Sequence, residues 1–196
     1  ASINAVFLSD WYAETQEVLY AETDLDELKA GPGDLDCQII PSGPGFRFEN
    51  NLRLFAALMY AAHRKLIIVS PYFVPDEAML LAITSACHRG VEVQLFVSEE
   101  GDQAMVYHAQ RSYYEVLLKA GVKIWMYRKP FILHSKSMTV DDEVAVIGSS
   151  NMDMRSFGLN MEISMLARGE EFITEMREVE AEYRSLSREL TLDEWE

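Results

Sequence analysis

The sequence predicts an α/β fold in which helices cover both faces of a mixed, largely parallel β-sheet. Three observations favour it. Short apolar runs alternate with longer helical segments between residues 50 and 127. Two helix-to-strand junctions read alike, with a glycine, Gly90 or Gly121, directly after each helix. Finally, helix–strand alternation of this length favours right-handed crossovers between parallel strands.

The first elements follow in chain order. An apolar-rich helix is expected over 6–20, and a short strand over 34–41 follows a Gly-Pro-Gly turn. A helix over 50–63 then leads to a strand over 65–70, whose Leu-Ile-Ile-Val run has no polar residue. Such a run is typical of a strand that is buried on both faces.

The next two helix–strand pairs repeat this arrangement. A helix over 76–89 precedes a strand over 91–97, and a helix over 103–120 precedes a strand over 122–127. In each pair the glycine at the helix end supplies the left-handed backbone that ends a helix. These pairs are expected to extend the parallel part of the sheet.

The last third is expected to add antiparallel strands. Ser135 to Val140 alternates loosely, Asp141-Asp142 reads as a turn, and 143–147 is again apolar, which together predict a hairpin. A strand-like segment over 160–166 and a charged amphipathic helix over 170–187 complete the chain. Residues 1–196 are expected to form a single domain.

Composition fits a soluble domain with a sizeable core. The chain has 196 residues, of which 49% are hydrophobic. It has no signal peptide and no apolar run near the roughly 20 residues that cross a bilayer. Cys37 and Cys87 show neither metal-ligand spacing nor a disulfide framework, which fits a reducing compartment. The start at Ala1 fits a segment excised from a longer protein.

The charge is strongly negative but unevenly distributed. A net charge of −15 argues against sequence-independent nucleic-acid binding, so no nucleic-acid partner is expected. Between Arg111 and Arg155 the chain has seven Lys and Arg against five acids, which leaves −17 for the remainder. A locally basic region of this kind suits an anionic substrate.

The basic region contains a constellation suited to phosphodiester chemistry. It reads His134-Ser-Lys136-Ser-Met-Thr-Val-Asp141, and Gly-Ser149-Ser-Asn151 follows. An imidazole can attack phosphorus or protonate a leaving oxygen, and an ammonium, a hydroxyl and a carboxamide can hold the phosphate oxygens. Side chains two apart share one face of a strand, so His134 and Lys136 are expected side by side. We predict that Lys136, Ser149 and Asn151 bind phosphate without a metal.

Acidic residues near this constellation receive different interpretations. Asp141 lies at the expected hairpin tip, far from His134 along the strand, and is interpreted as a structural residue of the turn. A catalytic imidazole needs its second ring nitrogen held, commonly by a carboxylate, and Glu162 is the one acid of the 160–166 segment. Glu162 is therefore predicted to orient His134, although a solvated strand residue is the alternative. Asp153 and Arg155 are interpreted as an ion pair or cap.

The constellation resembles the HxKxxxxD motif of the phospholipase D superfamily. Residues 69–77, 110–115 and 148–157 together resemble the C-terminal half of bacterial cardiolipin synthases, and 7–11 and 192–195 resemble the segments that bound this half. In the superfamily an acid just downstream of the motif orients the catalytic histidine, a role that the resemblance gives to Glu162.

The resemblance implies a phosphatidyl transferase of phospholipid biosynthesis. Such an enzyme makes cardiolipin and glycerol from two phosphatidylglycerols through a phosphohistidine, and it needs neither a metal nor an organic cofactor. The histidine of the second motif acts as general acid and base, a role that the resemblance gives to His134. A location at the cytoplasmic membrane is implied for the parent protein, through which the domain would meet anionic phospholipid.

A second motif is missing from the sequence. His63, His88 and His108 have no lysine two positions further on and no Gly-Ser-x-Asn segment after them. The chain is therefore expected to be half of a two-motif enzyme, or a protomer that pairs with a second copy, and to be nearly inactive alone. The surface around His134 is expected to be apolar where that partner packs.

Several alternatives stay open on the sequence. A hydrolytic phospholipase D uses the same residues, and a phospholipase D-type nuclease can work as a dimer of single-motif chains. A non-catalytic scaffold would keep the fold without needing the site. Residues 131–133 are either a buried strand run or a lip that faces lipid, and Tyr72 either lines an entrance or packs in the core.

Overall fold

The computed structural model describes residues 2–20, 35–46, 49–101 and 103–195. The chain divides into two compact units, residues 1–35 and 36–196, and each is described by itself. The first contains helix α1 (Ser2–Thr15), in place of the helix expected over 6–20. That residues 1–196 form a single domain stays a prediction.

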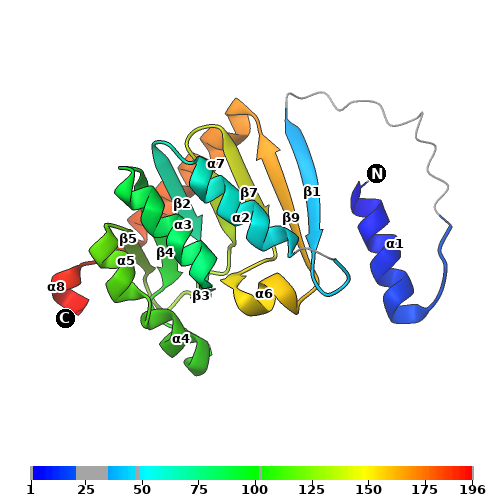
Figure 1. Cartoon of the computed structure of the whole chain (residues 1–196), viewed down its shortest axis with the longest axis horizontal. Coiled ribbons are helices and arrows are strands. Elements are labelled where there is room, and N and C mark those ends of the chain that lie inside the picture. The colour runs from blue at the N-terminus through cyan, green and yellow to red at the C-terminus, as the bar shows by residue number, and fades with distance from the viewer. Residues whose placement is uncertain (1, 21–34, 47–48, 102, 196) are drawn as a thin grey trace. The chain divides into compact units, whose positions relative to one another are not determined.

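The second unit is built on an eight-stranded sheet. The strands are β1 (Asp36–Ser42), β2 (Lys65–Val69), β4 (Glu92–Ser98), β5 (Lys123–Tyr127), β6 (Ser137–Val140), β7 (Val144–Gly148), β9 (Glu162–Arg168) and β10 (Ser187–Leu190). Their order across the sheet is β1-β9-β7-β6-β2-β4-β5-β10 (Figure 1). The predicted mixed α/β architecture is confirmed.

The parallel part of the sheet is narrower than the sequence indicated. Only β2, β4 and β5 pair in parallel, while the other neighbouring strands in the sheet are antiparallel. The reason is that β2, β4 and β5 follow one another through helical crossovers and lie side by side, whereas β1 is joined to β2 by a helix but is not its neighbour in the sheet. Beyond β5, the β6–β7 hairpin and the return to β9 join antiparallel neighbours, and the chain then crosses to β10, which pairs antiparallel with β5.

Helices cover both faces of the sheet. Helices α2 (Asn50–Ala61), α3 (Glu77–His88) and α5 (Tyr114–Ala120) lie in front of it in Figure 1, and α7 (Glu170–Ser185) lies behind. Strand β2 contributes side chains to the apolar core on both faces of the sheet, because successive side chains of a strand point to opposite sides. Leu66 and Ile68 join the apolar cluster under α2 and α3, whereas Ile67 and Val69 join the one on the α7 side.

The glycine signals at the helix ends are confirmed. Gly90 follows α3 with a φ of 88°, and Gly121 follows α5 with a φ of 100°. A side chain is strained in this left-handed region, whereas glycine adopts it freely. At the other end of α3, the carboxylate of Asp76 accepts a hydrogen bond from the Met79 backbone N–H at 2.8 Å and so caps the helix.

The expected helix over 103–120 is broken, which corrects the prediction. Helix α4 (Ala104–Arg111) ends before Ser112, whose hydroxyl donates at 2.6 Å to the carbonyl of Ala109. Such a bond competes with the helical backbone pattern. The buried Gln110 then fixes the junction, because it accepts from the Phe73 backbone N–H at 2.9 Å and donates to the Tyr114 hydroxyl at 2.6 Å.

Several short elements have no counterpart in the sequence-based prediction. They are β3 (Phe73–Val74), β8 (Met152–Asp153), α6 (Met154–Gly158), β10 and α8 (Leu192–Trp195). Strands β3 and β8 pair in parallel and tie the segment after β2 to the segment after β7. A two-residue strand is too short to leave a periodic signal, so only the folded chain reveals this pairing.

The β6–β7 hairpin holds Asp141 at its tip. Asp141 has a φ of 52°, and its buried carboxylate accepts backbone N–H groups of His63, Arg64 and Lys65 at 3.1, 2.8 and 2.8 Å. Burial alone raises the pKa of Asp141, but the three backbone donors outweigh it, and the pKa is lowered from its ordinary value. Asp141 thus fastens the hairpin to the turn before β2.

Replacing Asp141 with alanine is expected to lower the free energy of unfolding by about 2–4 kcal/mol, since three backbone donors lose a charged acceptor. The contribution of Asp141 is fully present above the pKa of the unfolded chain, about 3.9. It is lost as pH falls through the lower folded pKa. Urea unfolding at neutral and acidic pH measures both effects.

The matched control for this prediction is Glu143→Gln, which removes a carboxylate that is exposed at the same hairpin. It is expected to change stability by less than about 0.5 kcal/mol. Equal stability of Asp141→Ala and Glu143→Gln would show that Asp141 does not hold the hairpin.

Candidate active site

His134 lies at the edge of the sheet where the parallel strands end. The end of β2 pairs with the start of β6, with Val69 opposite Ser137. Just before His134, the buried Leu133 donates its backbone N–H to the hydroxyl of Ser98, the last residue of β4, at 3.0 Å. His134 itself is exposed. An anchored residue therefore presents an accessible imidazole at the edge where α/β sheets commonly bind ligands.

The ammonium of Lys136 lies beside the His134 imidazole. Lys136 Nζ is 3.3 Å from His134 Nδ1 and donates to the His134 carbonyl oxygen at 2.7 Å. The two residues precede β6, which begins at Ser137 rather than at the predicted Ser135. Their side chains nevertheless meet, so a cation and a titratable ring stand together at the site.

The pKa of Lys136 is lowered from its ordinary value. Burial is the main cause, because it disfavours the charged ammonium. The negative charges of Glu162 and Asp153 act in the opposite direction and offset part of the decrease. Both carboxylates thus influence the same ammonium, although they come from strands β9 and β8.

Ser149 and Glu162 form a second contact at the site. The Ser149 hydroxyl donates to one oxygen of the Glu162 carboxylate, and Asn160 Nδ2 donates to the other at 3.2 Å. Ser149 is also fixed by the backbone N–H of Ile163, which donates to its hydroxyl at 3.1 Å. The carboxylate and the hydroxyl are therefore oriented together by neighbouring strands.

The expected hydrogen bond between Glu162 and His134 is not found among the described residues. The carboxylate is instead engaged by Ser149, which the pairing of β7 with β9 brings to it, and by Asn160, which lies two residues before it. The Ser149 contact could not be anticipated from the sequence, because it depends on the register of the two strands. An orienting role for Glu162 stays a prediction.

Gly148 allows β7 and β9 to approach closely next to Ser149. A Cβ atom at this position would lie 2.5 Å from the Ile163 carbonyl oxygen and 2.8 Å from the Ser164 Cα. Both neighbours are backbone atoms of β9, which cannot move without shifting the strand. The glycine of the Gly-Ser-x-Asn segment is therefore a steric requirement.

Gly148→Ala is expected to destabilise the domain by about 1–3 kcal/mol, the usual cost of overpacking, and to displace Ser149 from Glu162. Thermal unfolding measures the first effect, and the shift of the Ser149 amide resonance the second. Gly158→Ala is the control, since a Cβ there meets no atom within 4 Å. Wild-type stability of Gly148→Ala would contradict the steric argument.

Asn151 and Asp153 complete the motif segment. The Oδ1 atom of Asn151 is buried and has no hydrogen-bond partner in the described part of the chain. The phosphate-binding roles of Ser149 and Asn151 stay predictions. The Asp153 carboxylate accepts a hydrogen bond from the Ser156 backbone N–H at 2.7 Å and caps α6. The interpretation of Asp153 as a cap is therefore confirmed. No ion pair between Asp153 and Arg155 is present among the described residues.

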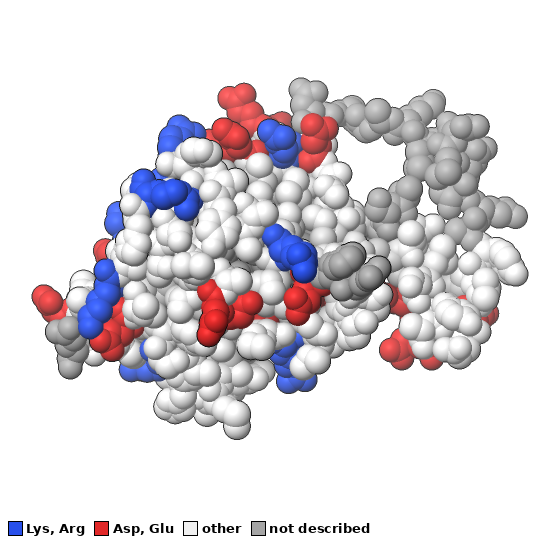
Figure 2. Space-filling view, in the orientation of Figure 1, with Lys and Arg blue, Asp and Glu red and all other residues white. Residues whose placement is uncertain are grey.

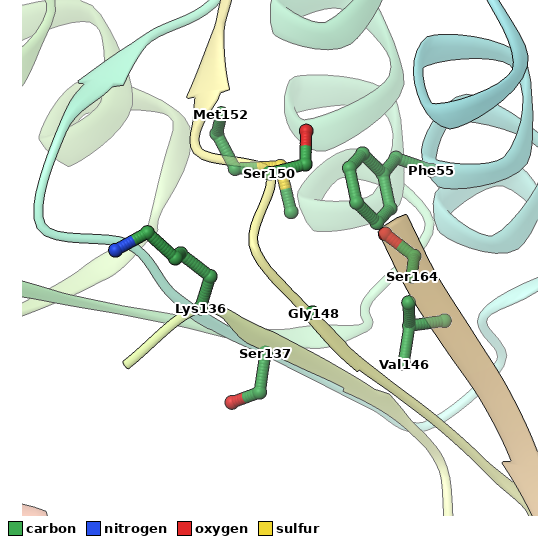
Figure 3. A pocket seen from close by; sticks show the side chains of 8 residues that line it. All are labelled: Phe55, Lys136, Ser137, Val146, Gly148, Ser150, Met152 and Ser164. Carbon is green, nitrogen blue, oxygen red and sulfur yellow. The ribbon is translucent and has the colours of Figure 1, made fainter. Parts of the chain in front are cut away.

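A small cavity lies beneath the motif strand (Figure 3). Its volume of about 10 Å³ holds roughly one water molecule, so it is too small for a phosphate. Figure 3 shows the Lys136 side chain extending away from Phe55 and Ser164 on the far side. The cavity is lined by Phe55, Lys136, Ser137, Val146, Gly148, Ser150, Met152 and Ser164.

Ser70 supports the site and was missed by the sequence analysis. Its buried hydroxyl accepts from the Met152 backbone N–H at 3.1 Å and donates to the Tyr72 carbonyl at 2.6 Å. Ser70 thereby joins the end of β2 to the segment that follows Asn151. A single serine after a strand gives no sequence signal for such a role.

The other histidines lie apart from His134. The His63 ring is 4.0 Å from Asp141 at the hairpin tip, His88 ends α3, and His108 lies on α4. No hydrogen bond or ring contact joins any of them to His134 in the part of the chain that is described. Nor do three His, Cys, Asp or Glu side chains cluster as a metal site there.

Comparisons with known proteins agree with this architecture. Residues 55–183 match the family model described as the PLD-like domain of cardiolipin synthase. The chain is 43% identical over 164 residues to a cardiolipin synthase of Alkalihalophilus pseudofirmus, which covers 83% of this chain and 32% of that protein. It is 35% identical over 198 residues to cardiolipin synthase A of Wigglesworthia glossinidia brevipalpis, covering 100% of this chain and 40% of that protein.

Solved structures show the same fold. The phospholipase D family member Nuc from Salmonella typhimurium superimposes with a TM-score of 0.68 at 18% identity, over 81% of this chain and 99% of Nuc. A phosphatidylserine synthase from Haemophilus influenzae gives a TM-score of 0.68 at 16% identity, over 83% of this chain and 41% of that one.

The chain spans about a third of the length of the cardiolipin synthases that it matches first. Its HxKxxxxD segment lies inside the residues that the family model covers. The chain therefore belongs to the family of cardiolipin synthase phospholipase D-like domains.

Proposed function

We propose that the chain is one half of a two-motif phosphatidyl transferase that makes cardiolipin from two phosphatidylglycerols. The contact between the Lys136 ammonium and the His134 imidazole carries the proposal, because it places a cation and a proton-transfer group at one exposed edge. The sequence identity of 43% to a cardiolipin synthase supports phosphatidylglycerol as the substrate. A single motif and a third of the length point to a missing second half.

The reaction consists of two displacements at phosphorus. First, Nε2 of a histidine in the other half bonds to phosphorus, the bond to the departing glycerol oxygen breaks, and His134 gives that oxygen a proton. Then a hydroxyl of a second phosphatidylglycerol gives its proton to His134 and attacks phosphorus, and the phosphorus–nitrogen bond breaks. The products are cardiolipin and glycerol, and both histidines return to their starting states.

The remaining residues of the site stabilise charge. Lys136, Ser149 and Asn151 hold the non-bridging oxygens on which negative charge develops. While phosphate is absent, Glu162 accepts the single O–H of Ser149, which turns to a phosphate oxygen when substrate binds, and Glu162 opposes the decrease in the pKa of Lys136. A carboxylate in this place helps to keep the ammonium protonated while phosphate is absent.

An experiment on a chimera tests the proposal. The matching segment of the A. pseudofirmus cardiolipin synthase is replaced by this chain, which is 43% identical to it. Labelled phosphatidylglycerol should then give labelled cardiolipin and free glycerol. Phosphatidic acid as the sole lipid product would instead identify a hydrolytic phospholipase D.

The pH dependence of the chimera should reflect the lowered pKa of Lys136. As pH rises, Lys136 loses its proton at a lower pH than an ordinary lysine, so the alkaline decrease in kcat/KM should begin early. Glu162→Gln removes a charge that raises this pKa and should shift the decrease to still lower pH. If kcat/KM decreases at the same alkaline pH in Glu162→Gln as in the unaltered chimera, Glu162 does not raise the pKa of Lys136.

A single-motif nuclease that works as a dimer is the second candidate. In its favour, Nuc is matched over 99% of its own length, so the fold occurs as a chain of this size. Against it, the net charge of −15 opposes a polyanionic substrate. Cleavage of single-stranded DNA by this chain, with no turnover of phosphatidylglycerol by the chimera, would favour the nuclease.

A membrane location belongs to the same proposal. No helix in the described part of the chain is long and apolar enough to cross a bilayer. In the proposed two-motif enzyme, other segments supply the permanent attachment to the cytoplasmic membrane, and this domain meets phospholipid at the surface.

A further inference from the structure

The loop between β5 and β6 presents an apolar tip directly before the motif. The Phe131 side chain is 70% exposed and that of Ile132 is 45% exposed. Leu133, the next residue, is buried at 3% and fixes the loop to the core on the α7 side. Of the two readings of residues 131–133, Leu133 thus follows the buried one, while the first two residues form a lip.

Two cations stand beside this tip. Arg128 and Lys129 are both exposed. A hydrogen bond from Arg188 lowers the pKa of Glu99, and the positive charge of Lys129 contributes to the decrease. The neighbouring carboxylate of Glu99 is engaged by Arg188, whose Nε donates to it at 2.6 Å. In a chain with a net charge of −15, two exposed cations next to two exposed apolar side chains form an unusual local composition.

Helix α4 lies beside the loop and extends this surface. Lys129 and residues of α4 line one cavity of about 490 Å³, so loop and helix are neighbours. Residues 103–110 contain no Lys, Arg, Asp or Glu, and Met105 is 86% exposed. In Figure 2 the projection at the place of α4 in Figure 1 is correspondingly white.

The cavity between them holds a further oriented cation. The Arg111 guanidinium lies 4.6 Å from the Trp195 ring centre and 5.3 Å from that of Tyr107, and it donates to the Tyr107 hydroxyl at 3.0 Å. Arg111 forms no ion pair with a described residue. Of the two acids in the lining, Glu99 is engaged by Arg188, and Glu100 is exposed.

We propose that this surface docks the domain onto an anionic phospholipid bilayer. Phe131, Ile132 and Met105 enter the boundary between headgroups and acyl chains, while the loop cations and Arg111 contact lipid phosphates. The inference rests on the proposed function and specifies how its substrate arrives. Because His134 follows Ile132 by two residues, insertion of the tip places the imidazole at headgroup depth.

The composition of the surface favours lipid over a second protein half. Lysine is depleted at the centre of protein interfaces, where its ammonium would lose water. Cations that flank an exposed aromatic and aliphatic tip instead match a bilayer, with phosphates outside and acyl chains beneath. Anionic lipid also supplies opposite charge to Arg128 and Lys129, both of which are exposed.

Vesicle sedimentation of the chain itself tests the apolar tip. The wild-type chain should bind vesicles of phosphatidylglycerol and phosphatidylcholine, and bind pure phosphatidylcholine vesicles much less. The double variant Phe131→Ser/Ile132→Ser should have a partition coefficient into mixed vesicles that is lower by about tenfold or more. Leu81→Ser is the control, since Leu81 is 60% exposed on α3 and should have no effect.

Charge variants test the cations of the loop. Arg128→Gln/Lys129→Gln should weaken binding to phosphatidylglycerol vesicles about tenfold and reduce its dependence on salt. Lys123→Gln is the control, because this exposed lysine begins β5, at the opposite end of the strand. Equal binding of the tip variant and wild type to mixed vesicles would overturn the proposal.

Two further measurements separate the remaining explanations. Loss of self-association or of pairing with the other half in the tip variant, without a change in vesicle binding, would assign the surface to a protein interface and contradict the proposal. His134→Ala should bind vesicles like wild type. Tip-dependent vesicle binding together with a chimera that makes no cardiolipin would keep the docking surface and reject the transferase function.

Discussion

His134→Ala in the chimera is expected to lower the rate of cardiolipin formation by about 10²–10⁴-fold, which is the usual contribution of general acid–base catalysis. The departing glycerol oxygen then leaves without a proton, and the second hydroxyl attacks without a base. The effect should appear in kcat, because the Lys136 ammonium that binds phosphate remains. Initial rates with labelled phosphatidylglycerol measure it.

His88→Ala is the matched control for this variant. His88 is an exposed histidine at the end of α3, away from the motif, and its loss should leave the rate unchanged. Thermal unfolding of both variants should match that of the unaltered chimera, since neither side chain is buried. Cardiolipin output from His134→Ala at the level of His88→Ala would remove His134 from the mechanism.

The isolated chain is expected to form cardiolipin more slowly than the chimera by a similar or larger factor. Attack and leaving-group protonation need two groups on opposite sides of phosphorus, and the described residues place one motif histidine at the site. Adding the separately expressed other half should restore activity. A copy of that half with its own motif histidine replaced by alanine should not.

Local signals in the sequence predicted most of the framework. The all-apolar run of β2 and the glycines after α3 and α5 act within a few residues, so the parallel centre of the sheet could be anticipated. The hairpin followed from alternation around Asp141-Asp142. The narrower parallel part was not anticipated, because the order of β9 and β1 depends on long-range pairing.

The site was predictable in its residue types but not in all of its contacts. The two-residue spacing of His134 and Lys136 indicated a shared side, and the two side chains do meet. Glu162 was expected to contact the imidazole, yet it accepts from Ser149, which the register of β7 on β9 places beside it, and from Asn160, two residues before it. The break after α4 likewise depends on one hydroxyl bond of Ser112, which helix propensity does not reveal.

Activity and molar mass measured on the same chromatographic fractions show whether the isolated chain holds only half of the catalytic site. Labelled phosphatidylglycerol is supplied to fractions of the isolated chain, and light scattering gives the mass of each. The expected result is negligible cardiolipin from fractions of a single 22.4 kDa chain, and activity only where a second motif-bearing half or a second copy is present. Robust transfer by a species that is monomeric in the assay would contradict it.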